Sequence, residues 1–167
     1  MKSVCHILST GLISLLVGCS STPVALAPVG PNPVGAGGMA SKGGLQVFSG
    51  LVTRTEGDNP TWNQHTDYYI YSSQGKLMKH VDNTTGYYAR APRLIPLPAG
   101  SYIVKAQAVD NLWVDVPVVI ERGRTTRIHL DDNWKLPTHT PKSELVSMPG
   151  GNPVGWHAES SSKLGIN

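Results

Sequence analysis

Apolar and polar residues alternate in short runs along the middle of the chain, from residue 45 to residue 131. The alternation is clearest in three runs, at residues 101–108, 113–121 and 125–130. In the second run, one face carries Val114, Val116, Val118 and Ile120. Because successive side chains of a strand point to opposite faces of its sheet, each run predicts a strand with one buried face.

Turn-forming residues separate these runs from earlier β-prone runs at residues 45–52, 66–71, 76–81, 87–90 and 93–97. No ten-residue window shows the helical period together with capping residues. The sequence therefore predicts an all-β protein, with a single Greek-key β-sandwich of about seven strands over residues 45–131. Residues 19–44 and 132–167 lack the alternation and contain much Pro and Gly, so we expect a flexible tether and a mostly irregular tail.

Two turns bear on how the strands connect. Gly123 lies in the segment that joins the last two runs, where it can adopt a positive φ, and this favours a hairpin between those runs. Pro98 presets the φ of a tight turn, and Gly100 suits its last position. Tyr102 follows directly, in an arrangement similar to the tyrosine corner of Greek-key sandwiches, in which the phenol bonds to an upstream backbone group.

The stretch from Leu97 to Leu130 resembles the end of a carboxypeptidase-regulatory-like, transthyretin-like domain. The matching residues are Leu-Pro-Ala-Gly-x-Tyr-x-Val, then Val-x-Val-x-Val-x-Ile-x-x-Gly, then Thr-x-x-x-Leu. The resemblance implies an Ig-like or transthyretin-like sandwich. It implies little about function, because such domains serve many proteins as structural or adhesive modules.

A basic residue, Lys2, lies near the start of the chain, and an apolar stretch at residues 7–17 follows it and ends in small residues. These are the features of an export signal, and the stretch is shorter than the roughly 20 apolar residues that span a bilayer. Its end, Leu16-Val17-Gly18-Cys19, resembles a bacterial lipobox. That resemblance implies that residues 1–18 are a signal peptide, that Cys19 receives acyl chains such as palmitate, and that Cys19 becomes the first residue.

Ser20 follows the cysteine, and in lipoproteins this residue implies the outer membrane, with the domain facing the periplasm. Two acyl chains already suffice for stable membrane anchoring. The alternative is an ordinary signal peptide that is cut elsewhere, with Cys19 incidental.

Charge and cysteine content exclude several classes of site. Removal of residues 1–18 leaves 13 basic and 11 acidic side chains, and the net charge falls from +3 to +2. Without a Lys/Arg cluster, we expect no nucleic-acid binding. Cys5 is lost with the signal, so Cys19 has no partner for a disulfide and no thiolate metal site is expected.

Catalytic and metal-binding patterns are missing from the sequence. The histidines after residue 18 show no ligand spacing, and they are His65, His80, His129, His139 and His157. Adjacent strands could bring His80 and His129 together, but nothing in their spacing requires it. There is no Gly-x-Ser-x-Gly motif and no catalytic cysteine. We therefore expect no enzyme, no metal and no cofactor.

Aromatic residues provide the candidate binding face, which comprises Trp62, Tyr68, Tyr69, Tyr71, Tyr87 and Tyr88. Alternation places neighbouring tyrosines on opposite sides of a strand, so some of them face outward. Exposed aromatics stack on sugars or anchor protein partners. The alternative is that the tail covers them, with Trp134 or Trp156 packed on that face. We expect Trp113 and Tyr102 to be core or corner residues.

These features predict a membrane-anchored periplasmic module with a binding or structural role, such as an accessory subunit of an envelope assembly that holds a protein partner. The second hypothesis is a lipoprotein that binds carbohydrate or peptidoglycan through its exposed aromatics.

Overall fold

Strands dominate the computed structural model, which describes residues 25–33, 41–55, 57, 62–83 and 91–158. Its described part contains twelve strands in three sheets, together with two single-turn 3-10 helices, η1 (Val109–Asn111) and η2 (Lys142–Glu144). The prediction of an all-β protein is therefore confirmed. The strands are more numerous than the roughly seven expected, because the segments at both ends contribute some of them.

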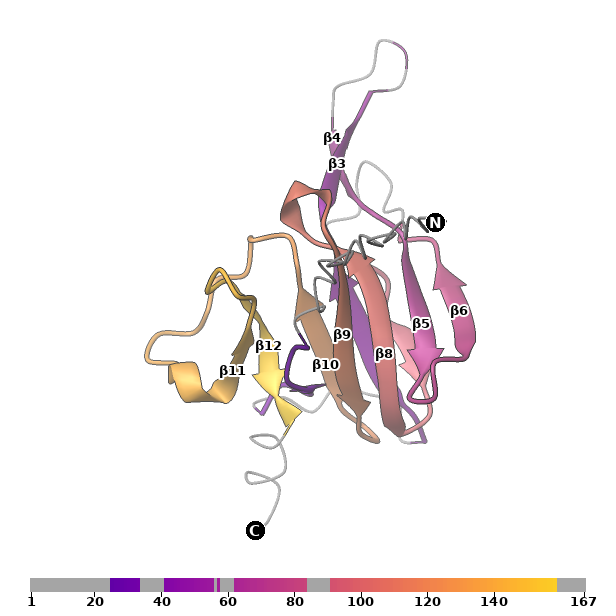
Figure 1. Cartoon of the computed structure of the whole chain (residues 1–167), viewed down its shortest axis with the longest axis vertical. Helices are drawn as coiled ribbons and strands as arrows, with labels where there is room; N and C mark the ends of the chain where they lie inside the picture. Colours follow the sequence, from indigo (N-terminus) through magenta and orange to yellow (C-terminus); the bar gives the residue numbers. More distant parts are fainter. Residues whose placement is uncertain (1–24, 34–40, 56, 58–61, 84–90, 159–167) are drawn as a thin grey trace, which may run out of the picture.

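The larger sheet has seven strands, and four of them, β9, β8, β5 and β6, lie side by side in Figure 1. In spatial order they are β11 (Leu145–Ser147), β12 (Pro153–His157), β1 (Val29–Gly30), β9 (Trp113–Ile120), β8 (Gly100–Gln107), β5 (Tyr68–Ser72) and β6 (Leu77–Val81). Neighbouring strands are antiparallel except β1 and β9, which are parallel. The longest pairing joins β8 and β9, from Gly100 opposite Ile120 to Gln107 opposite Trp113.

A smaller sheet consists of β10 (Thr125–His129), β2 (Gly43–Phe48) and β7 (Ile95–Leu97), with β10 parallel and β7 antiparallel to β2. The two sheets share one buried core. The larger sheet contributes Val104 and Val116, and the smaller contributes Leu45, Val47 and Ile128, all with no exposed surface. Apolar positions predicted to share a face therefore do so, because the two-residue period directs them into the core.

The third sheet is a hairpin of β3 (Leu51–Arg54) and β4 (Trp62–His65) that projects from one end of the molecule (Figure 1). A two-stranded ribbon is at best marginally stable by itself in water. His65 connects the base of this hairpin to the rest of the protein, because its ring atom Nδ1 lies 2.7 Å from the Ser49 carbonyl oxygen.

The predicted turn at Gly123 forms, but the predicted hairpin is wrong. Gly123 has a φ of 69°, and the Arg124 N–H donates to the Glu121 carbonyl at 3.3 Å. However, β9 belongs to the larger sheet and β10 to the smaller one, so the chain passes from one layer to the other at this turn. Alternation shows which face of a strand is buried, and both layers offer such a face, so it does not identify the neighbouring strand.

The predicted tyrosine corner is present. Tyr102 is 8% exposed, and its hydroxyl donates to the Pro98 carbonyl oxygen at 3.0 Å. Gly100 between them has a φ of 154°. The bond joins the turn before β8 to the strand itself, which fixes how β8 enters the larger sheet.

Both end segments contribute strands to the larger sheet, which corrects the expectation of a tether reaching to residue 44. Val29 in β1 has no exposed surface and pairs with Val118 of β9 and His157 of β12. Gly155 in β12 approaches the body so closely that a Cβ there would lie 2.9 Å from the Arg127 carbonyl oxygen. A two-residue strand has no detectable period, so the sequence pattern could not reveal β1.

Tryptophans of the tail pack on the smaller sheet and not on the predicted tyrosine face. Trp134 stacks on His129 with ring centroids 4.5 Å apart, and His129 stacks on Phe48 at 4.4 Å. Trp156 meets Trp134 edge-on at 6.0 Å and is 7% exposed. Phe48 and His129 alternate with the buried Val47 and Ile128, so this stack covers the smaller sheet's outer side.

This stack predicts a pH-dependent stability. Burial, with Arg127 and His65 as smaller contributions, lowers the pKa of His129 from 6.5 to about 4. In the unfolded chain the imidazole takes a proton near pH 6.5, whereas in the folded chain it stays neutral down to about pH 4. The contribution of His129 to the free energy of unfolding is therefore complete above pH 6.5. It is lost as the pH drops towards 4, and the loss is about 2 kcal/mol after allowance for the partial exposure of the ring.

Urea unfolding at pH 7 and pH 4.5 would test this expectation, with His129→Gln as the comparison. The wild-type chain should lose more stability between the two pH values than the variant does. An equal loss in both proteins would show that His129 does not cause the pH dependence.

Candidate functional site

The outer face of the larger sheet carries the exposed aromatics. Tyr69 and Tyr71 lie on this face and are partly exposed, whereas Tyr68 and Ile70 point into the core with no exposed surface. The placement of Tyr68 on a binding face is therefore wrong, and its burial raises the pKa of its phenol above the ordinary value. Trp62 is half-buried in β4 on the projecting hairpin.

Two further predicted binding residues, Tyr87 and Tyr88, lie outside the described residues, as does Cys19.

Trp113 corrects another expectation. It was predicted to be a core or corner residue, but it is 48% exposed at the start of β9. Alternation explains the difference, because Val114 and Val116 face inward and Trp113 must then face outward with Asp115. The ring of Trp113 lies 6.0 Å from that of Tyr69, which in turn stacks on His80 of β6 at 4.8 Å.

A polar cleft of about 450 Å³ lies between the β3–β4 hairpin and this aromatic cluster. The side chains that matter most for its chemistry are Arg54, Gln64, Asp67, Tyr69, His80 and Trp113. Of these, Arg54 and Gln64 come from the hairpin, so the projecting ribbon forms one wall. The tertiary fold alone brings these walls together, which is why the sequence pattern did not reveal the cleft.

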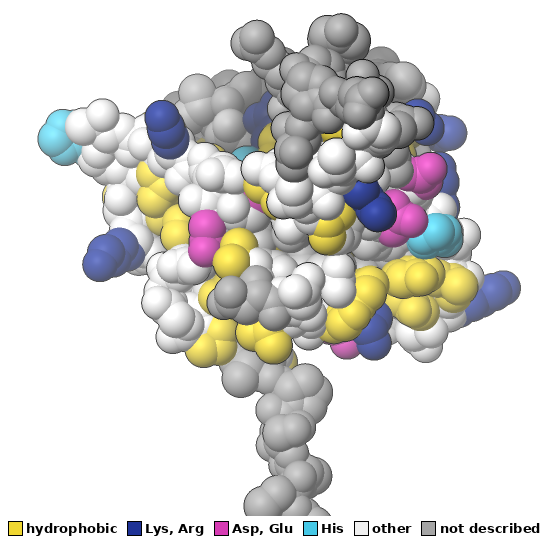
Figure 2. Space-filling model, turned by 90° about the horizontal axis from the view of Figure 1, so that it is seen from above, with side chains coloured by type: hydrophobic (Ala, Val, Ile, Leu, Met, Phe, Trp, Pro, Cys, Tyr) yellow, Lys and Arg dark blue, Asp and Glu magenta, His cyan; other side chains and the backbone are white. Residues whose placement is uncertain are grey.

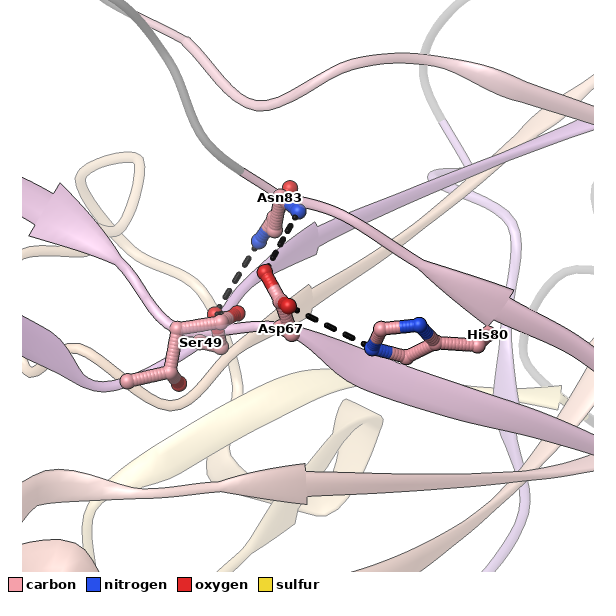
Figure 3. A network of polar contacts seen from close by, with 5 residues as sticks. Ser49, Asp67, His80 and Asn83 are labelled. Carbon is pink, nitrogen blue, oxygen red and sulfur yellow. Dashed lines mark hydrogen bonds and ion pairs between the residues drawn. The ribbon is translucent and has the colours of Figure 1, made fainter.

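A hydrogen-bond network holds one side of the polar cleft in place (Figure 3). The Asp67 carboxylate lies 3.3 Å from His80 Nε2 and accepts the Asn83 backbone N–H at 3.1 Å. The Asn83 side-chain amide donates to the Val47 carbonyl and to Ser49 Oγ, both at 3.0 Å. Asn83 is 1% exposed and Ser49 is fully buried. Buried residues therefore hold the Asp67 carboxylate in its position in the cleft.

An apolar groove of about 670 Å³ adjoins the polar cleft. One side of the groove is formed by the segment β8–β9, with Ile103, Leu112 and Pro117. The two end segments form the other side, with Leu26 and Met148. Trp113 lines both hollows, and Leu112 is 60% exposed. Viewed from the hairpin end, hydrophobic side chains gather along the lower edge of the molecule (Figure 2).

His80 and His129 do not converge. His80 packs on Tyr69 of the larger sheet, whereas His129 lies between Phe48 and Trp134 on the smaller one. Among the described residues, no group of three or more His, Cys, Asp or Glu side chains is arranged to hold a metal ion. The same part of the chain contains no helix with the length and apolar character needed to cross a membrane.

Comparisons with known proteins add no relationship: no family model matches the chain, and no curated protein or solved structure is significantly similar to it.

Proposed function

We propose that the chain is a membrane-anchored module of the bacterial envelope that holds a protein partner on the outer face of its larger sheet. The observation that carries this proposal is the apolar groove, where Leu112 is 60% exposed and Trp113 is 48% exposed. Contiguous exposed apolar surface marks interaction sites, and tryptophan is enriched among the residues that contribute most to binding. An accessory subunit of an envelope assembly would use such a surface.

The anchor in this proposal is a lipid on Cys19, as the lipobox resemblance implies, with Ser20 directing the protein to the outer membrane. Val29, the first residue of the larger sheet, is ten residues after Cys19. Ten residues span at most about 35 Å, so the sheet would remain close to the periplasmic surface of the bilayer. Confinement to a surface raises the effective concentration of any partner held there.

The resemblance of residues 97–130 to transthyretin-like domains remains part of the proposal. The bond from Tyr102 to Pro98 and the two sheets around one core support a Greek-key sandwich of that kind. The added strands β1, β11 and β12 would then be extensions of the larger sheet.

A charge placed in the apolar groove tests the partner. Leu112→Asp should reduce, at least tenfold, the recovery of a stoichiometric protein from detergent-solubilised envelopes, because an unpaired carboxylate would be buried in the interface. Leu94→Asp is the matched control, since Leu94 is 42% exposed and lies beside Gly44 of the smaller sheet. Equal recovery with both variants, or no stoichiometric partner with the unchanged chain, would contradict the proposal.

A further inference from the structure

We propose that the polar cleft beside the hairpin is a second binding site on this face and that its ligand is an acidic saccharide. The inference uses the proposed function in one respect, the choice of an envelope glycan as the source of the sugar. The side chains that line the cleft define the site itself.

The aromatic side of the polar cleft provides a stacking surface. Tyr69 is held by the His80 ring at 4.8 Å, and the exposed Trp113 lies 6.0 Å away at an angle of 40°. A pyranose ring presents a face of C–H groups, which pack against aromatic rings of this kind. Because Tyr69 is already held in place by a neighbouring ring, less conformational entropy is lost when a ligand binds.

The remaining walls of the polar cleft supply hydrogen-bonding groups. Arg54, Gln64, Asp67 and Gln107 line it, so guanidinium, amide and carboxylate groups face the same space as the two aromatic rings. A ligand that matches this lining has one apolar face and many hydroxyl groups, and saccharides have both. The volume of about 450 Å³ is within the usual range of small-molecule sites.

The Arg54 guanidinium in the polar cleft favours an acidic sugar. The Asp67 carboxylate is already engaged, because it lies 3.3 Å from His80 Nε2 and accepts the Asn83 backbone N–H at 3.1 Å. Arg54 also lines the cleft, and the described part of the chain contains no ion pair to its guanidinium. A planar guanidinium recognises a carboxylate through two parallel hydrogen bonds. A glycan with carboxylate-bearing amino sugars, as in peptidoglycan strands whose stem peptides have been removed, therefore fits better than a neutral or cationic one.

Calorimetric titration of the full chain, purified from membranes in detergent, tests the assignment with two disaccharides. The acidic probe is N-acetylglucosaminyl-N-acetylmuramic acid and the neutral probe is diacetylchitobiose. We expect the acidic probe to bind, Tyr69→Ala to weaken it at least tenfold, and Arg54→Gln to abolish the preference for it. Leu94→Asp should leave it unchanged, because Leu94 lies beside Gly44 of the smaller sheet and lines neither the apolar groove nor the polar cleft.

The outcomes separate this inference from the proposed partner. If neither sugar binds to the unchanged protein, the saccharide site is overturned even where Leu112→Asp still releases a protein partner. If both sugars bind equally, the assignment to acidic saccharides is overturned. Binding that Tyr69→Ala leaves intact, in a variant with an unchanged unfolding temperature, places the sugar elsewhere.

Discussion

A shortened chain that begins at Lys42 is expected to lose much of its cooperative fold, although it keeps every strand that the alternating pattern predicts. It lacks β1, whose Val29 is fully buried between β9 and β12. Burying one valine side chain contributes about 1.5–3 kcal/mol. Without β1, β12 also loses its neighbour on the side of β9. We therefore expect the free energy of unfolding to fall by more than about 3 kcal/mol, which is a large part of the stability of a typical domain.

Thermal unfolding, followed by circular dichroism, provides the measurement. The matched control is a chain that begins at Ala25, which also lacks the first residues but retains β1. The control should unfold cooperatively near the temperature of the longer protein, and the chain from Lys42 should unfold well below it or without cooperativity. Identical unfolding temperatures would show that β1 contributes nothing to the fold.

The faces of the long strands could be predicted from the sequence. Val116, Val118 and Ile120 are at most 2% exposed, as the two-residue period of residues 113–121 requires. The tyrosine corner at Tyr102 was also predictable, because a proline and a glycine at fixed positions specify the turn before it. In both cases the determining interactions are local in the chain.

The pairing of strands could not be predicted in the same way. The parallel pair of β10 and β2 joins Thr125 to Gly44, residues far apart in the sequence. The turn at Gly123 formed as expected and still led into the other sheet. A turn residue determines how the chain bends, whereas the partner of the next strand depends on which sheet can bury its apolar face.

Part of the candidate site was accessible from the sequence. Alternation requires that either Tyr68 or Tyr69 faces outward. The same rule places Trp113 and Val114 on opposite faces of β9. The hydrophobicity of tryptophan predicts that Trp113 is buried, whereas the alternating pattern predicts that it faces outward, and the structure agrees with the pattern. The polar cleft could not be predicted, because only the folded protein brings Arg54 of the hairpin and Trp113 to the walls of one cleft.

A Cys19→Ala variant is expected to move almost completely from the membrane fraction to the soluble fraction. Cys19 lies outside the described residues, so this prediction rests on the lipobox resemblance. Each buried methylene of an acyl chain contributes about 0.8 kcal/mol, and two chains together give stable anchoring. The substitution removes the thiol that would carry the lipid and touches no strand of the described sheets, so the unfolding temperature should not change. Val17→Ala is the matched control, because it retains the cysteine.

Labelling cells with radioactive palmitate, followed by sedimentation of membranes, tests the proposed membrane anchoring most directly. We expect label in the unchanged protein and none in Cys19→Ala, and we expect that variant to remain in the supernatant. Failure of the unchanged protein to take up palmitate, or sedimentation of Cys19→Ala with the membranes, would contradict a lipid anchor at this residue.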